Sequence, residues 1–101
     1  MEIKDLRNGM KRVSVEATVK EKSPSRQVMS RFKDETYTVA DAIVADESGS
    51  IKLTLWNEQI ALLNVNDKIK IENGYVTSFK GEIQLNIGKF GKLSVNDQPV
   101  G

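Results

Sequence analysis

Apolar and polar residues alternate along much of this chain in short stretches that predict β-strands. Every second residue between positions 13 and 19 is apolar, which is the period of a strand with one buried face. We therefore expect a first strand over residues 13–20. The polar stretch 22–35 contains Pro24 between two serines, and its composition predicts a loop.

The next two strands are predicted on either side of a tight turn. Residues 36–45 are rich in β-branched and aromatic side chains and predict the second strand. Residues 46–49, with the sequence Asp-Glu-Ser-Gly, predict a hairpin turn. In the third strand, 51–56, aliphatic residues alternate with polar ones. If the aliphatic set faces the interior, Trp56 shares the outward face with Lys52 and Thr54.

A short helix and two further strands complete the predicted elements. We expect the helix over residues 57–63, with Asn57 as its N-cap, and a fourth strand over 67–76. Its alternation slips at Asn73-Gly74, which predicts a bulge and leaves the face of Tyr75 open. The hairpin 77–81 places Phe79 and Lys80 near its tip.

Residues 82–87 alternate again and predict the fifth strand, followed by a short closing segment up to position 93. Five strands with one helix between the third and the fourth predict an all-β fold, the five-stranded Greek-key barrel called the OB fold. We expect residues 1–94 to form this one domain. Residues 95–101 are expected to be a frayed end or the stub of a tail.

The composition excludes several kinds of chemistry. The chain has 101 residues with no Cys and no His, so it has no thiol nucleophile, no disulfide and no imidazole base. The adjacent carboxylates Asp46-Glu47 point to opposite faces of a strand end and do not form an acid/base pair. We predict no enzyme activity, no metal and no cofactor. The apolar runs are too short for a membrane helix, and an intracellular protein without membrane contact is expected.

The net charge of +1 conceals an uneven distribution. Residues 1–33 hold nine bases and four acids, for a charge of +5, whereas residues 34–47 hold five acids and no base. A polyanionic partner is therefore compatible with the sequence. Charge alone favours an ordinary solvated surface.

Two stretches, 42–56 and 71–86, resemble the archaeal single-stranded DNA-binding proteins with one OB domain, which are similar to human OB-domain sensors of single-stranded DNA and share pieces with replication protein A. The resemblance extends over about residues 3–94. It implies that Trp56, Tyr75 and Phe79 stack on successive bases, and that Arg26 lies in a loop that contacts the nucleic-acid backbone. Asn86 stands where some eukaryotic relatives carry a fourth stacking aromatic, so no fourth stack is expected.

Further candidates come from their position beside these aromatics. Lys52 and Lys80 are the preferred phosphate contacts because they adjoin the aromatic residues. Thr54 and Ser78 are expected to donate hydrogen bonds to phosphate or sugar. The secondary candidates are Arg31, Lys33, Lys89 and Lys92 for phosphate and Phe32 for additional stacking. Tyr37 and Phe90 are expected to be packing residues.

The sequence thus predicts a module that binds single-stranded DNA with little sequence preference and protects it in replication, recombination and repair. Stacking does not distinguish DNA from RNA, so a binder of single-stranded RNA is one alternative. The other is an assembly subunit of a larger replication complex, in which the same aromatics bury against a protein. We expect a monomer in isolation, associated with the nucleoid and with other replication or repair proteins.

Overall fold

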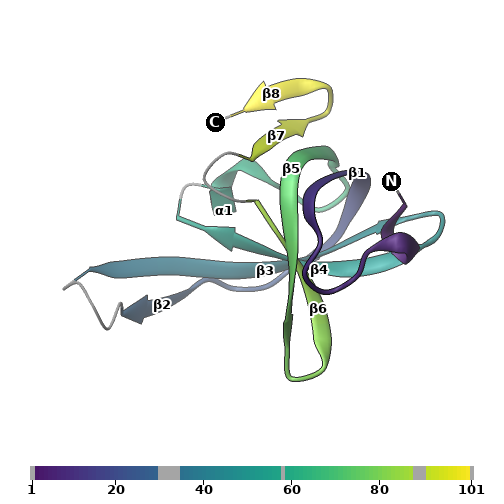
Figure 1. Cartoon of the computed structure of the whole chain (residues 1–101). Helices are drawn as coiled ribbons and strands as arrows, with labels where there is room; N and C mark the ends of the chain where they lie inside the picture. The colour runs from purple at the N-terminus through teal and green to yellow at the C-terminus, as the bar shows by residue number, and fades with distance from the viewer. Residues whose placement is uncertain (1, 30–34, 58, 88–90, 101) are drawn as a thin grey trace.

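Five strands close into a barrel. The computed structural model describes residues 2–29, 35–57, 59–87 and 91–100, and Figure 1 shows its strands wrapped around one interior. The barrel strands are β1 (Lys11–Lys22), β3 (Thr36–Asp46), β4 (Gly49–Trp56), β5 (Lys68–Phe79) and β6 (Glu82–Asn86). Antiparallel pairing joins β1 to β3, β3 to β4 and β5 to β6, whereas β4 and β6 are parallel. Pairing of β1 with β5 closes the ring, and this confirms the predicted OB-fold architecture.

The barrel interior contains the apolar residues that the alternation predicts. Ile51, Leu53 and Leu55 of β4 are buried, as is every second residue of β1 between positions 13 and 19. Leu63, directly after the helix, joins the same cluster. Burial of one such side chain contributes about 1.5–3 kcal/mol, so this cluster is the main favourable contribution to folding.

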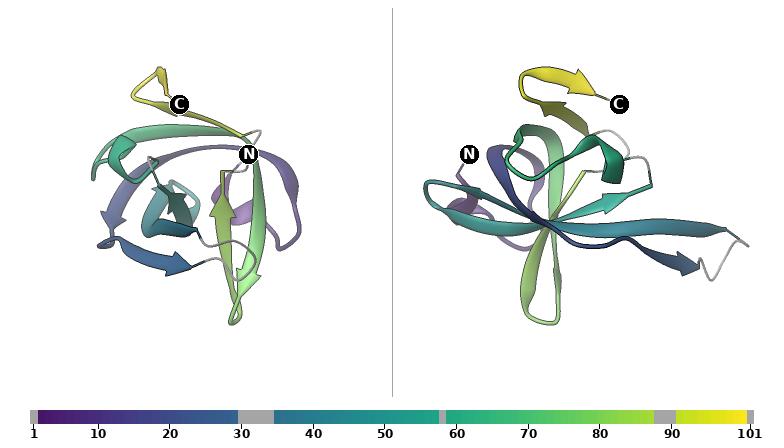
Figure 2. Two further views of the ribbon diagram at one scale, coloured as in Figure 1. Left: turned by 90° about the vertical axis from the view of Figure 1, so that its left-hand side faces the viewer. Right: turned by 180° about the vertical axis from the view of Figure 1, so that it is seen from behind.

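The predicted loop 22–35 is wrong for five of its described residues, of which Lys22 ends β1. Arg26–Met29 form strand β2, which pairs with the first part of β3. All four side chains are exposed, so the strand has no buried face and no alternation of polarity. This is why the pattern indicated a loop. In Figure 1 and in the right view of Figure 2, the β2–β3 hairpin projects beyond the barrel.

The expected frayed end is also wrong for the residues that the structure describes. Strand β7 (Lys92–Val95) pairs with β5, and β8 (Gln98–Val100) pairs with β7. Between them, Asn96 and Asp97 both have positive φ, which is the geometry of a two-residue hairpin turn. The Asn96 N–H donates to the Lys68 carbonyl at 2.7 Å, and this bond attaches the hairpin to the barrel.

The predicted helix is shorter than expected. Helix α1 (Gln59–Leu62) is a single turn, and none of the helices within the described residues has the length and apolar character to cross a membrane. Asn57 does not cap it as predicted. Its side-chain oxygen accepts the Thr38 N–H at 3.1 Å, and its own N–H donates to the Thr38 carbonyl at 2.7 Å. Asn57 therefore extends the ladder between β3 and β4.

Strand β5 contains the predicted bulge at Asn73-Gly74. On β1, Val15 lies opposite Ile71 and Val13 lies opposite Gly74, so two residues of β5 face one residue of β1. Asn73 has a φ of 59°, as expected for the extra residue at such a site. The bulge bends β5, which pairs with β7 before it, with β6 after it and with β1 on both sides of it.

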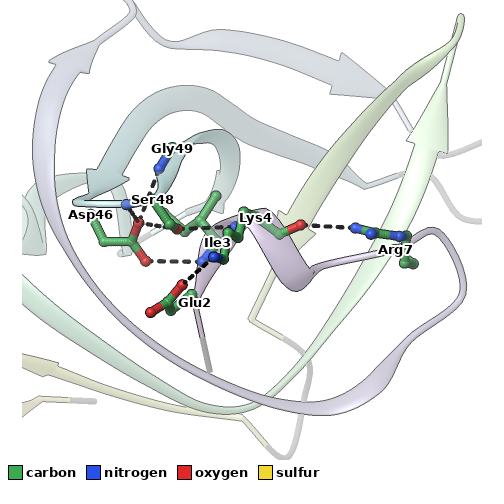
Figure 3. A network of polar contacts seen from close by, with 7 residues as sticks. All are labelled: Glu2, Ile3, Lys4, Arg7, Asp46, Ser48 and Gly49. Atoms are coloured by element: carbon green, nitrogen blue, oxygen red, sulfur yellow. Dashed lines mark hydrogen bonds and ion pairs between the residues drawn. The ribbon is translucent and has the colours of Figure 1, made fainter.

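The amino-terminal segment is fastened to the β3–β4 turn by the Asp46 carboxylate (Figure 3). One carboxylate oxygen accepts the Ile3 N–H at 2.9 Å, and the other accepts the N–H groups of Ser48 and Gly49. The Ser48 hydroxyl also donates to this carboxylate. These bonds, first that of the Ser48 hydroxyl and then that of the Ile3 N–H, lower the pKa of Asp46 from 3.8 to about 2.

We predict that Asp46→Asn lowers the melting temperature at neutral pH, because the amide cannot accept all of these bonds as a carboxylate does. The folded-state pKa lies below the unfolded one, so this stabilisation is complete above about pH 4 and disappears as the pH falls through about 2. Thermal unfolding against pH measures it, with exposed Glu47→Gln as the control. A difference from wild type that stays constant down to acid pH contradicts the assignment.

We predict that Gly74→Ala destabilises the barrel by about 1–3 kcal/mol through overpacking. A Cβ at Gly74 would lie 2.9 Å from the Asn86 backbone oxygen and 3.1 Å from a methyl group of Ile71. Urea unfolding measures the change. Gly49→Ala is the matched control, because nothing lies within 4 Å of its added Cβ. Equal stabilities of the two variants would contradict the close approach of β5 and β6.

Candidate nucleic-acid interface

Strand register places one continuous set of side chains on the outside of β3, β4, β6 and β5. On β4, Thr54 lies opposite Asp41 of β3 and beside Asn86 of β6, and Asn86 lies opposite Tyr75 of β5. The next outward row contains Ile43, Lys52, Gln84 and Thr77, and the last contains Glu82 and Phe79. We call this outward set, together with Trp56, Arg26 of β2 and Tyr37 and Val39 of β3, the aromatic face. It extends from the β2–β3 hairpin to the β5–β6 hairpin, the two arms visible in Figure 2.

Trp56 lies at the end of β4, opposite Val39 of β3. Trp56 is 39% exposed, and its backbone N–H donates to the side-chain oxygen of Gln59 at 3.1 Å. The outward position predicted from the alternation is therefore confirmed. An indole held at a strand end with this much surface in solvent is available for a stacking partner.

Tyr75 owes its position to the bulge. Ile69 and Ile71 point into the barrel before the bulge, whereas Gly74 and Val76 are the buried positions after it. The extra residue shifts the alternation by one, and Tyr75 consequently faces outward with 38% of its surface exposed. The structure thus resolves the face that the sequence left open.

Phe79 is the most exposed of the three aromatics. It is 61% exposed and ends β5, directly before a turn in which Lys80 and Gly81 both have positive φ. This two-residue turn is tighter than the predicted hairpin 77–81. The Lys80 ammonium lies 5.4 Å from the centroid of the Phe79 ring, within the range of a cation–π contact, and so brings a positive charge to the ring.

Tyr37 belongs to this site, although the sequence indicated only a packing role. Its ring meets that of Trp56 edge to face, with centroids 6.1 Å apart and an interplanar angle of 83°. Its hydroxyl donates to the Glu35 carboxylate at 2.7 Å, and this bond raises the pKa of Tyr37. The sequence carried no signal for this contact, because it depends on the strand register that places Val39, two residues from Tyr37, opposite Trp56.

Polar side chains form the floor between the aromatics, and sequence reasoning missed most of them. The Asn86 amide donates to the Thr77 hydroxyl at 3.1 Å and to the Gln84 carbonyl at 3.4 Å. Thr54, a predicted contact, is only 7% exposed, and its hydroxyl donates to the Gln84 side chain at 3.4 Å. Thr54 therefore helps to order the floor and offers little surface to a ligand.

Two of the predicted basic residues lie on the same face, and each is paired with an acid. Arg26 lies opposite Val39, and its guanidinium is 3.2 Å from the Asp41 carboxylate. The Lys52 ammonium is 3.7 Å from the Glu82 carboxylate. Exposed ion pairs of this kind contribute about 0–1 kcal/mol, so a phosphate can displace either carboxylate.

Other predicted residues lie elsewhere. Ser78 alternates with Thr77 and Phe79 and so points to the other side of the β5–β6 hairpin. Lys92 lies opposite Glu72, in the part of β5 that pairs with β7, and Figure 1 shows β7 on the far side of the barrel from the hairpin tip. The remaining predicted contacts lie outside the described residues: Arg31, Phe32, Lys33 and Lys89.

The aromatic face is open rather than enclosed. A cavity of about 270 Å³ beside it is lined by Asp41, Ile43 and Lys52 together with the end of β1. A cavity of about 480 Å³ lies across the molecule, between β1, β5 and the β3–β4 turn, and none of the described residues that line it is aromatic. An open face with exposed rings suits an extended ligand better than a compact one.

Comparison with known proteins agrees with this geometry. The protein named single-stranded DNA binding protein Ssb, from Saccharolobus solfataricus, is 39% identical over 90 residues, which cover 89% of this chain and 60% of that protein. This chain thus spans less than two thirds of that relative. The OB domain of Ta0387 from Thermoplasma acidophilum has a TM-score of 0.82 at 20% identity, covering 100% of this chain and 90% of the other.

The second OB-fold domain of replication protein A from Methanococcus maripaludis has a TM-score of 0.78 at 18% identity, covering 100% of this chain and 98% of that domain. At such identities the structural likenesses show the fold. The family model described as single-stranded DNA binding protein Ssb-like, OB fold, matches residues 6–95. The chain therefore belongs to the Ssb-like family of OB-fold single-stranded DNA-binding proteins.

Proposed function

We propose that the aromatic face binds single-stranded DNA with little sequence preference. Bases stack on Trp56, Tyr75 and Phe79, and phosphates pair with Arg26, Lys52 and Lys80. The observation that carries this proposal is the convergence of three exposed rings, from two strands and a hairpin tip, on one continuous face. Every base has a π-face, so such rings hold a strand without reading its sequence.

The energies are sufficient for a useful affinity. Stacking contributes about 1–3 kcal/mol per base, so three rings supply roughly 3–9 kcal/mol before any phosphate contact. A dissociation constant of about 1 μM corresponds to about 8 kcal/mol. Stacking with a few phosphate contacts therefore reaches the affinity at which a protein covers exposed strands.

In this proposal the chain is a binding module without catalysis, acting inside the cell where strands are exposed in replication, recombination and repair. Family membership supports this role, as does the name of the Saccharolobus protein.

The two alternatives, a single-stranded RNA ligand and a protein partner over the same rings, are outcomes of the experiment below. Oligo-dT, oligo-U and a duplex are titrated against the fluorescence of Trp56, the only Trp.

Quenching of Trp56 by oligo-dT, with weak or no quenching by duplex DNA, is the expected result. Stronger quenching by oligo-U than by oligo-dT would indicate that the ligand is single-stranded RNA. Absence of quenching by every single strand would contradict the proposal and favour the protein partner. Because one fluorophore reports one place, the signal locates the ligand as well as detecting it.

We predict that Trp56→Ala raises the Kd for labelled oligo-dT roughly five- to a hundredfold, the loss of one stack. The loss exceeds that of any single Lys→Ala change, because each exposed cation contributes less than a ring. Fluorescence anisotropy measures both. Val65→Ala is the matched control, since Val65 is 48% exposed outside the aromatic face. A larger loss in Lys52→Ala than in Trp56→Ala would refute a stacking platform.

We predict that the affinity for oligo-dT falls as salt rises. Each phosphate contact on a single strand contributes a slope of about −0.7 in log K against log salt. The three proposed contacts, from Arg26, Lys52 and Lys80, therefore give a slope no steeper than about −2. Titration over a series of salt concentrations measures the slope. A binding constant independent of salt would contradict the phosphate contacts and leave only stacking.

A further inference from the structure

The acids on the aromatic face stand where a nucleic-acid site is expected to be basic. Asp41 pairs with Arg26, and Glu82 pairs with Lys52. Register places both acids on this face, Asp41 opposite Thr54 and Glu82 opposite Phe79. Two of the three basic side chains proposed to contact phosphate, Arg26 and Lys52, are therefore neutralised within the protein.

Asp41 is held in place by the backbone around it. Its N–H donates to the Ser23 hydroxyl at 2.9 Å, and the Ser23 N–H donates to the Asp41 carbonyl at 2.7 Å. The carboxylate is 23% exposed and Glu82 is 70% exposed. Asp41 and Lys52 line one cavity of about 270 Å³, so the two ion pairs are neighbours.

Single strands and duplexes respond differently to such a face. A duplex keeps its bases stacked inside and offers a protein surface mainly phosphate charge, so its non-specific binding is almost entirely electrostatic. A single strand offers base faces as well and gains from stacking, whatever the charge of the surface. Neutralising the basic side chains of the protein therefore weakens duplex binding more than single-strand binding.

We propose that Asp41 and Glu82 are specificity-determining residues, which make the aromatic face select single-stranded over duplex nucleic acid by neutralising Arg26 and Lys52. This inference rests on the proposed function. On a single strand, stacking holds the ligand while its phosphates exchange with the two carboxylates. On a duplex, nothing offsets that exchange, and the carboxylates keep their partners.

The test compares Asp41→Asn, Glu82→Gln and the double variant with wild type. Anisotropy at low salt measures Kd for labelled oligo-dT and for a mixed-sequence duplex of equal length. In the double variant we expect duplex affinity to rise about tenfold and oligo-dT affinity about threefold or less, with a steeper salt slope for the duplex. The ratio of the two affinities thus falls.

Glu72→Gln is the matched control. Glu72 also pairs with a lysine, Lys70, at 3.4 Å, and its side-chain exposure lies between those of Asp41 and Glu82, but it is in the part of β5 that pairs with β1 and β7. Glu72→Gln changes the net charge by as much as either single variant, and there the change should leave the ratio unchanged. Melting temperatures verify that each variant is folded. Glu82→Gln, at an exposed hairpin, tests the selectivity for single strands independently of any change at Asp41.

The outcomes separate the two proposals. If wild type binds oligo-dT and the double variant keeps the same ratio, or gains more affinity for oligo-dT than for duplex, the selectivity role is overturned and the proposed function stands. A fall of the ratio in Glu72→Gln equal to that in Asp41→Asn or in Glu82→Gln would also overturn it, since net charge alone would then suffice. If wild type binds no single strand, the proposed function itself fails.

Discussion

The bulge in β5 is the constraint on which the aromatic face depends. Without the extra residue at Asn73, the alternation that buries Ile69 and Ile71 would continue unbroken, and Tyr75 and Phe79 would point into the barrel. With it, Val76 fills the interior and both rings face outward. Gly74 makes the same site compatible with the close approach of β6. One irregular backbone position therefore has two effects. It bends β5 at the point where its pairing with β7 ends and its pairing with β6 begins, and it selects which residues reach solvent for ligand binding.

Charge on this face has a different character from that of a general polyanion-binding surface. The excess of bases in the first third of the chain is opposed by acids that follow it in sequence, and in the structure Asp41 meets Arg26 across the β2–β3 hairpin. The cations are present but compensated, and the rings are exposed. A ligand that presents only charge gains little from such a surface. A ligand that presents base faces gains most of its affinity from the rings, with phosphate pairing as a smaller addition.

The barrel strands were predictable because each buries one face, and burial leaves a period-two signal in the sequence. The same reasoning placed Trp56 outward and located the bulge, but it did not orient Tyr75, since a bulge changes the face of every residue after it. Strand β2 left no signal because both of its faces are in solvent. The contact of Tyr37 with Trp56 and the pairing of Arg26 with Asp41 depend on strand register, which a single sequence does not specify.

The central claim is that base stacking on Trp56, Tyr75 and Phe79 holds the strand. Nuclear Overhauser contacts between the ring protons of the protein and the base protons of bound oligo-dT test this claim most directly. The account predicts contacts from all three rings to bases, with upfield shifts of those ring resonances. Contacts confined to the cavity between β1 and β5, lined by Glu16 and Lys68, would contradict it.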